Sequence, residues 1–71
     1  MDLTTVEIGK EYIITDILTD DEELDAFLFT LGCYTGEPIT VVSRKRKTMV
    51  VSIKDSRYSI DTALGRAITV K

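Results

Sequence analysis

The side chains of this chain that could do chemistry are one cysteine, a run of acids and a cluster of bases. Cys33 is the sole cysteine, and the sequence contains no histidine. Metal sites usually recruit several cysteines or histidines, so one thiolate with scattered carboxylates makes a poor cage. A cysteine or serine nucleophile would also lack its usual imidazole base. We therefore predict no catalytic, cofactor or metal site within one copy. A thiol site shared between two copies is the alternative for Cys33.

Two glycines flank this cysteine in the segment LGCYTGEPITVV, residues 31–42. A phosphate-binding loop needs a strand before its glycines and a helix after them. Here the order is reversed, because a helix pattern precedes Gly32 and a strand led by Pro38 follows Gly36. We expect Gly32 to end the helix and Gly36 to form a turn. A free cysteine at such a corner behaves as a small buried apolar residue.

Carboxylates crowd the segment TDDEELD, residues 19–25. Four acids would fall in the first turn of a helix, where the helix dipole favours negative charge. We interpret them as a solvated helix start rather than as an acid–base pair. Thr19 and Glu22 have the spacing of a capping box, which predicts that the helix begins there.

Basic side chains cluster in the segment SRKRK, residues 43–47. No aromatic residue stands beside them, whereas a nucleic-acid site would need a broader patch and stacking rings. We expect a solvated hairpin tip and no nucleic-acid partner, with a contact to acidic lipid headgroups or to an acidic partner as the alternative. The four bases are Arg44, Lys45, Arg46 and Lys47.

Charge is divided unequally along the chain, whose formal net charge is −3. Residues 1–37 carry ten acids and one base (−9), and residues 38–71 carry eight bases and two acids (+6). If the halves pack together, this division helps them to attract each other. If the charges lie on opposite surfaces, the molecule has a dipole that could orient it on a partner.

The elements that would position these groups are short and closely spaced. Alternating β-branched residues predict a strand at about 11–18. Leu24, Phe27, Leu28 and Leu31 form one apolar stripe of a helix, with Phe29 off that stripe. Three meandering strands follow, with Ile39, Val41 and Ser43 on one face of the first, and with Met49, Val51 and Ile53 together on the next. Asp61 or Thr62 would cap a short helical turn that Gly65 breaks, and residues 67–70 form a last strand.

Five or six short strands in a chain of 71 residues need closure to hide their edges. We therefore predict a mainly β fold: one domain, residues 1–71, forming a small barrel with the helix plugging one end. No secretory signal pattern opens the sequence, no apolar run is long enough to span a membrane, and no disulfide can form within one copy. These features favour the cytoplasm.

The order of these elements resembles the FeoA family. The resemblance rests on the run Leu28–Cys33, the run Gly36–Val41, the central strand Met49–Lys54 and the closing Ile68–Val70. It extends nearly from end to end of the chain. It implies an SH3-like β-barrel and a small cytoplasmic accessory of FeoB, the membrane ferrous-iron transporter that carries a G-protein domain.

The resemblance, together with the lack of a predicted catalytic or metal site, predicts a protein–protein interaction module. Such a module would dock on the transporter at the inner face of the membrane, with an apolar anchor inside a charged rim. The candidate anchors are Phe29, Cys33 and Tyr34, unless Phe29 and Cys33 belong to the core. The basic tip from Arg44 to Lys47 is a second candidate surface. A direct iron-binding protein, a nucleic-acid-binding barrel and a regulator of nucleotide turnover are the rival functions, and a weak homo-oligomer is compatible with the sequence.

Overall fold

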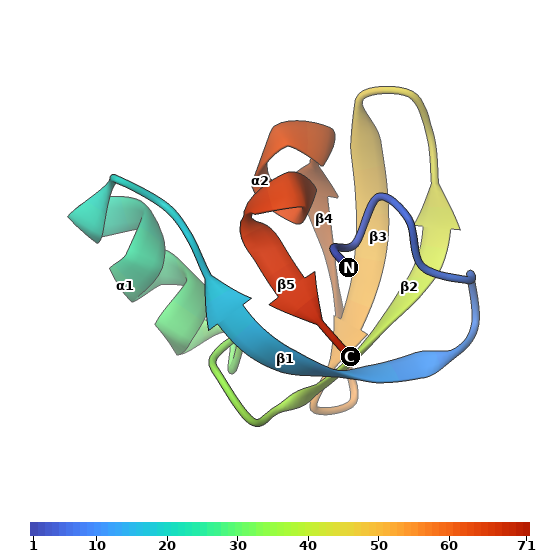
Figure 1. Cartoon of the computed structure of the whole chain (residues 1–71), viewed down its shortest axis with the longest axis horizontal. Helices are drawn as coiled ribbons and strands as arrows, with labels where there is room; N and C mark the ends of the chain where they lie inside the picture. The colour runs from blue at the N-terminus through green and yellow to red at the C-terminus, as the bar shows by residue number, and fades with distance from the viewer.

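The computed structural model describes residues 1–71 and contains five strands and two helices (Figure 1). In chain order the elements are β1 (Glu11–Ile17), α1 (Glu22–Thr30), β2 (Pro38–Arg44), β3 (Thr48–Ile53), β4 (Ser56–Asp61), α2 (Thr62–Ala67) and β5 (Ile68–Val70). This order confirms the prediction of a mainly β fold with one helix after the first strand and a short helix before the last.

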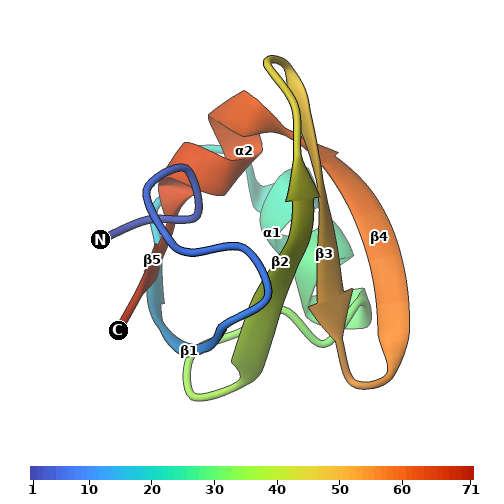
Figure 2. The same ribbon diagram turned by 90° about the vertical axis from the view of Figure 1, so that its right-hand side faces the viewer.

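The strands form one antiparallel sheet in the order β4-β3-β2-β1-β5, and two bulges bend it. The register shifts between Ile14 and Asp16 in β1 and between Val41 and Ser43 in β2. Because a bulge adds a residue to one strand and increases the local twist, the sheet curls (Figure 2). Helix α2 runs directly from the end of β4 to the start of β5, so it bridges the two edge strands.

The core is one cluster of buried apolar side chains on the inner face of this curved sheet. The predicted alternation in β3 is confirmed, and in β2 it holds for Ile39 and Val41. The prediction for Ser43 is wrong, because the bulge after Val41 turns Ser43 out to solvent. The cluster consists of Leu3, Val6, Tyr12, Ile14, Leu28, Cys33, Ile39, Val41, Met49, Val51, Ile53, Ile60, Leu64, Ile68 and Val70.

Helix α1 lies at one end of the molecule, beside the curved sheet (Figure 1). Its N-cap is Asp21, whose carboxylate accepts hydrogen bonds from the amides of Glu23 and Leu24, so the predicted Thr19–Glu22 capping box is wrong. Leu28 is fully buried and Leu24 packs against the core. The helix therefore contacts the sheet along a narrow line of side chains.

The predicted apolar stripe of α1 is too wide. Phe27 is 52% exposed, although its spacing placed it on the same stripe as Leu28. The helix has only 9 residues and buries only Leu28 fully against the sheet. Phe27, the neighbour of Leu28 on the predicted stripe, is therefore left in solvent.

The short helix α2 begins as predicted and continues further than predicted. Asp61 is its N-cap and accepts a hydrogen bond from the amide of Leu64 at 2.6 Å. Gly65 does not break the helix, because it lies within it and is buried. A Cβ at Gly65 would come within 2.6 Å of the methyl carbon of Met49, so the glycine makes room for that side chain.

Candidate interaction surface

The end of α1 is shaped by a glycine in the left-handed conformation. Gly32 has φ +85°, and its amide donates to the carbonyl of Phe29 at 3.0 Å. The amide of Cys33 donates to the carbonyl of Leu28 at 2.9 Å, so two carbonyls left free by the helix end are satisfied. This confirms that Gly32 ends the helix. The reversal brings Tyr34 back alongside Phe29.

Phe29 and Tyr34 form an aromatic pair at this corner, in which Phe29 is exposed and Tyr34 is half-buried. Phe29 is 66% exposed, and its ring centroid lies 5.1 Å from that of Tyr34 with an angle of 34° between the ring planes. Aromatic rings attract each other at this separation, so each holds the other in place. The pair is therefore a large apolar surface that is partly preorganised in the free protein.

A lysine from β3's end completes the corner. The side chain of Lys54 crosses the face of Gly32, where a Cβ would lie 2.7 Å from the Cδ of Lys54. Its Nζ lies 5.5 Å from the ring centroid of Tyr34 and 3.2 Å from Oε2 of Glu37. The hydrogen bond to Glu37 and then the contact with Tyr34 raise the pKa of Lys54. The missing Cβ of Gly32 thus lets a cation lie against the aromatic pair.

Cys33 has to be removed from the predicted contact residues, because it is buried. Its side chain is 2% exposed and lies in the core cluster. Burial raises the pKa of the Cys33 thiol to about 11, so the thiol stays protonated near neutral pH. A protonated, enclosed thiol is neither a ready nucleophile nor a ready metal ligand. No three His, Cys, Asp or Glu side chains lie close enough together to hold a metal ion.

The basic segment 44–47 divides into one structural arginine and three solvent-exposed bases. Nη1 of Arg44 donates to the carbonyls of Leu3 and Val6 at 3.1 and 2.9 Å, which ties the N-terminal segment to β2. Arg44 therefore has a structural role, and its place in the second candidate surface stays a prediction. The side chains of Lys45, Arg46 and Lys47 are exposed at the tip of the β2–β3 hairpin.

The structure brings together two of the predicted anchors and adds two residues that the sequence did not indicate. Phe29 and Tyr34 meet, whereas the hairpin tip lies on the other side of the molecule from α1 (Figure 1). Lys54 and Glu37 are the additions. The sequence gives no sign of this contact, because Lys54 and Glu37 are brought together by the path of the backbone at Gly32 and not by their spacing along the chain.

These observations define the class of protein. The chain is a small SH3-like β-barrel that displays an aromatic pair beside an ion pair on its surface. The FeoA domain model matches residues 1–71, so the chain belongs to the FeoA family, which is associated with ferrous iron transport. No curated protein matches the chain.

Two solved structures share the fold. One is an iron uptake regulatory protein, FeoA, with a TM-score of 0.88 and 21% identity over 100% of this chain and 95% of that one. The other is Stenotrophomonas maltophilia FeoA in complex with zinc, with a TM-score of 0.84 and 16% identity over 100% of this chain and 89% of that one. That protein is described as an SH3 domain protein and proposed as a bacterial ferrous iron transport activating factor.

The helices of this chain are short. Neither of them has both the length and the apolar character needed to cross a membrane.

Proposed function

We propose that this chain is a non-enzymatic accessory protein of ferrous iron transport that binds the cytoplasmic part of a FeoB-like transporter. Membership of the FeoA family supports the transport role. The one cysteine is buried and protonated, and the chain has no histidine, so its surface offers shape and charge rather than reactive groups. The protein would then work in the cytoplasm, peripheral to the inner face of the membrane.

The observation that carries this proposal is the exposed ring of Phe29, packed against the half-buried Tyr34. Phe29 is a large apolar side chain, yet it leaves 66% of its surface in solvent and does not belong to the core. Aromatic side chains are enriched among the residues that dominate binding energy at interfaces. Tyr34 supports the ring of Phe29, so little conformational freedom is lost when a partner covers it.

The ion pair beside the aromatic pair gives the surface a polar rim. Lys54 and Glu37 are joined at 3.2 Å, and their side chains are 49% and 23% exposed. A partly exposed pair contributes little to affinity, but it excludes water from the apolar centre and favours one orientation of the partner. An apolar centre inside a charged rim is the usual organisation of a transient interface.

The test is capture from native membranes that contain the transporter. Tagged wild-type protein, Phe29→Asp and Phe27→Asp are each mixed with detergent-solubilised membranes, and the proteins that co-elute are identified. The expected result is that wild type and Phe27→Asp retain the transporter and that Phe29→Asp loses it. Retention by Phe29→Asp would contradict the proposed surface, and failure of the wild type to retain any transporter would contradict the proposed function.

A second measurement separates this proposal from direct iron handling. Ferrous iron is titrated calorimetrically into the protein under anaerobic conditions. We expect no tight stoichiometric binding to one copy, because no group of ligands surrounds a common point. A tight site within a single copy would overturn the proposal.

A further inference from the structure

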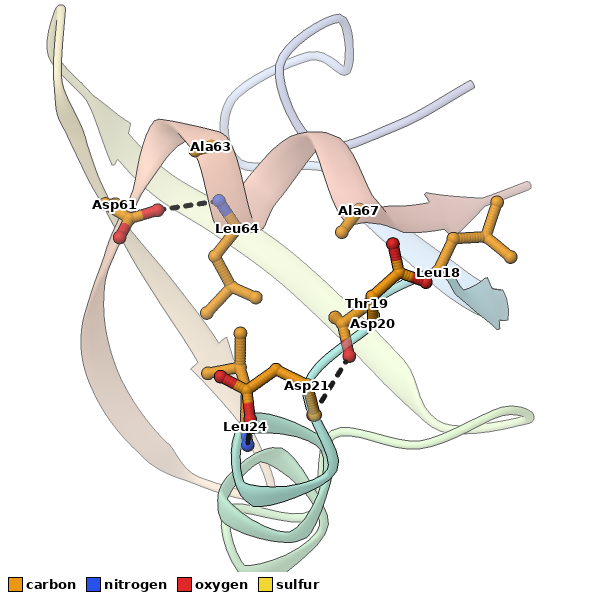
Figure 3. A pocket seen from close by; sticks show the side chains of 9 residues that line it. All are labelled: Leu18, Thr19, Asp20, Asp21, Leu24, Asp61, Ala63, Leu64 and Ala67. Carbon is orange, nitrogen blue, oxygen red and sulfur yellow. Dashed lines mark hydrogen bonds between the residues drawn. The ribbon is translucent and has the colours of Figure 1, made fainter.

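A groove lies between the N-terminal end of α1, with the segment that precedes it, and the length of α2 (Figure 3). The aromatic pair is at the other end of α1. Its volume is about 410 Å³, which is within the range of pockets that bind ligands with several side-chain-sized groups. Asp21 at its edge and Phe29 of the aromatic pair are eight positions apart, so about 12 Å of helix separates the two surfaces.

The floor of the groove is apolar. Leu24 of α1 and Leu64 of α2 form it, with the small side chains of Ala63 and Ala67 along the α2 wall. Leu18 is 68% exposed at its mouth, where its amide donates to the carbonyl of Ala67 at 2.8 Å. An exposed leucine held against a helix offers apolar surface that no other part of the chain covers.

The rim of the groove is acidic. Asp20, Asp21 and Asp61 line it, and no lysine or arginine does. Asp21 and Asp61 use Oδ1 to cap their helices, and no hydrogen bond to Oδ2 forms within the chain. A helix N-terminus carries only about half a positive charge, so the two helix ends offset part of this negative charge.

The negative charge is strongest on the α1 side. Three further acids follow in the first turn of α1, namely Glu22, Glu23 and Asp25. On the α2 side the basic hairpin tip is near, because the amide of Thr62 donates to the carbonyl of Lys47 at 2.9 Å. That tip forms no ion pair with Asp61, since the one ion pair of the structure joins Lys54 to Glu37.

We propose that this groove binds a polypeptide segment of a partner in which one or two apolar side chains stand next to a lysine or arginine. The apolar side chains would cover Leu24 and Leu64, and the cation would face Asp20 and Asp21. Charge complementarity selects this occupant, because an acidic or neutral apolar segment would leave the rim carboxylates without a counter-charge. The site is independent of the transporter-binding surface and does not require the proposed function.

The test is a nuclear magnetic resonance titration of the ¹⁵N-labelled protein with three short synthetic peptides. The first contains leucine and lysine, the second has glutamate in place of lysine, and the third has serine in place of leucine. The expected result is that the first peptide alone shifts the amide signals of Leu24, Ala63 and Leu64. Higher salt should weaken its binding, because the attraction between exposed charges is screened.

Two surface variants and two matched controls locate the binding. Leu18→Ser and Asp20→Lys change exposed residues of the groove, and each should weaken binding of the leucine–lysine peptide by about 5- to 10-fold. The controls are Ile8→Ser, at a residue 52% exposed elsewhere, and Glu7→Lys, and both should bind like wild type. Phe29→Ala should also bind like wild type.

Four results would overturn the proposal. The first is the absence of shifts at the groove with the leucine–lysine peptide, and the second is equal binding of the glutamate peptide. The third is loss of binding in Phe29→Ala, which would place the peptide on the aromatic pair. The fourth is a concentration-dependent shift of the groove signals without peptide, which would show that a second copy of the chain covers the groove. None of these measurements contains the transporter, so their outcome is separate from the test of the proposed function.

Discussion

Replacement of Phe29 by alanine should weaken transporter binding by about 5- to 30-fold. Full burial of a large apolar side chain contributes roughly 1.5–3 kcal/mol. Phe29 is 66% exposed in the free protein, so about two-thirds of that contribution, roughly 1–2 kcal/mol, remains to be gained when a partner covers it. Because each 1.4 kcal/mol corresponds to about tenfold in Kd, this range gives the stated loss.

The chain supplies its own matched control in Phe27. Both phenylalanines stand on α1, and Phe27 is 52% exposed. Two positions along a helix correspond to about 200° of rotation, so the rings point to opposite sides of α1. Only Phe29 contacts Tyr34. Phe27→Ala should therefore change Kd by less than about twofold, since surface positions outside a contact contribute within about 0.5 kcal/mol.

Both variants should remain folded, because neither ring belongs to the core. Loss of the ring–ring contact in Phe29→Ala costs about 0.5–1.5 kcal/mol. In a domain of this size each kcal/mol lowers the Tm by roughly 4–8 °C, so the Tm should fall by up to about 12 °C with a cooperative transition retained.

The assay is calorimetric titration of the purified cytoplasmic part of the transporter, with circular dichroism melts of each variant. If both phenylalanine variants weaken binding equally, the interface is not centred on the Phe29–Tyr34 pair. If Phe29→Ala loses its cooperative transition, the ring supports the fold and its assignment to a partner surface is wrong.

Three further changes test other parts of the structure. Burial raises the pKa of Cys33 from 9.0 to about 11. Between pH 9 and pH 11 the thiol therefore keeps its proton in the folded state and loses it in the unfolded state. The free energy of unfolding should fall by up to roughly 2–3 kcal/mol as the pH rises through this range. Urea unfolding of Cys33→Ala should lack that pH-dependent part, and a thiol reagent should label the folded wild type slowly. Gly32→Ala should destabilise more than Gly36→Ala, since both glycines have positive φ but only at Gly32 would the new methyl group displace Lys54. Equal urea midpoints for the two glycine variants would show that the lysine moves aside without cost. Arg44→Ala removes a charged donor from two backbone carbonyls and should lower the free energy of unfolding by about 1.5–3 kcal/mol, with faster amide exchange in residues 3–6.

The fold was predictable because its signals are local and repeat along the chain. The alternation of Met49, Val51 and Ile53 has the period of a strand with one buried face, and each of the three is buried. Gly32 follows an apolar helix pattern, which is the usual place for a left-handed helix end. These signals involve residues within a few positions of one another, so they can be read before the tertiary structure is known.

The parts that could not be predicted depend on residues far apart in sequence. Arg44 belongs to a basic run, and only the fold shows that it reaches the carbonyls of Leu3 and Val6. Phe27 has the spacing of a buried residue, but helix periodicity cannot tell how wide a face the barrel covers. Charge and spacing in the sequence describe one helix or strand by itself, whereas the exposure of its side chains depends on which other elements pack against it.

Folding keeps the two densest charge clusters of this chain apart. The one ion pair, Lys54 with Glu37, joins the basic part of the sequence to the acidic part. The acids of α1's first turn and the bases of the β2–β3 hairpin tip lie at opposite sides of the molecule (Figure 1). These two clusters therefore do not neutralise each other, and their separation contributes a dipole to the molecule.

This dipole and the aromatic pair should act on different steps of binding. Long-range charge steers two molecules during approach, so it acts mainly on the association rate and is weakened by salt. Close apolar contacts form only after docking, so the aromatic pair acts mainly on the dissociation rate. A partner that approaches α1 with a basic surface would be oriented by the acids of the first turn and then held at Phe29 and Tyr34. The short helix thus carries an acidic first turn and an exposed aromatic ring on one rigid element, so variants of each can be tested separately for association and dissociation rates.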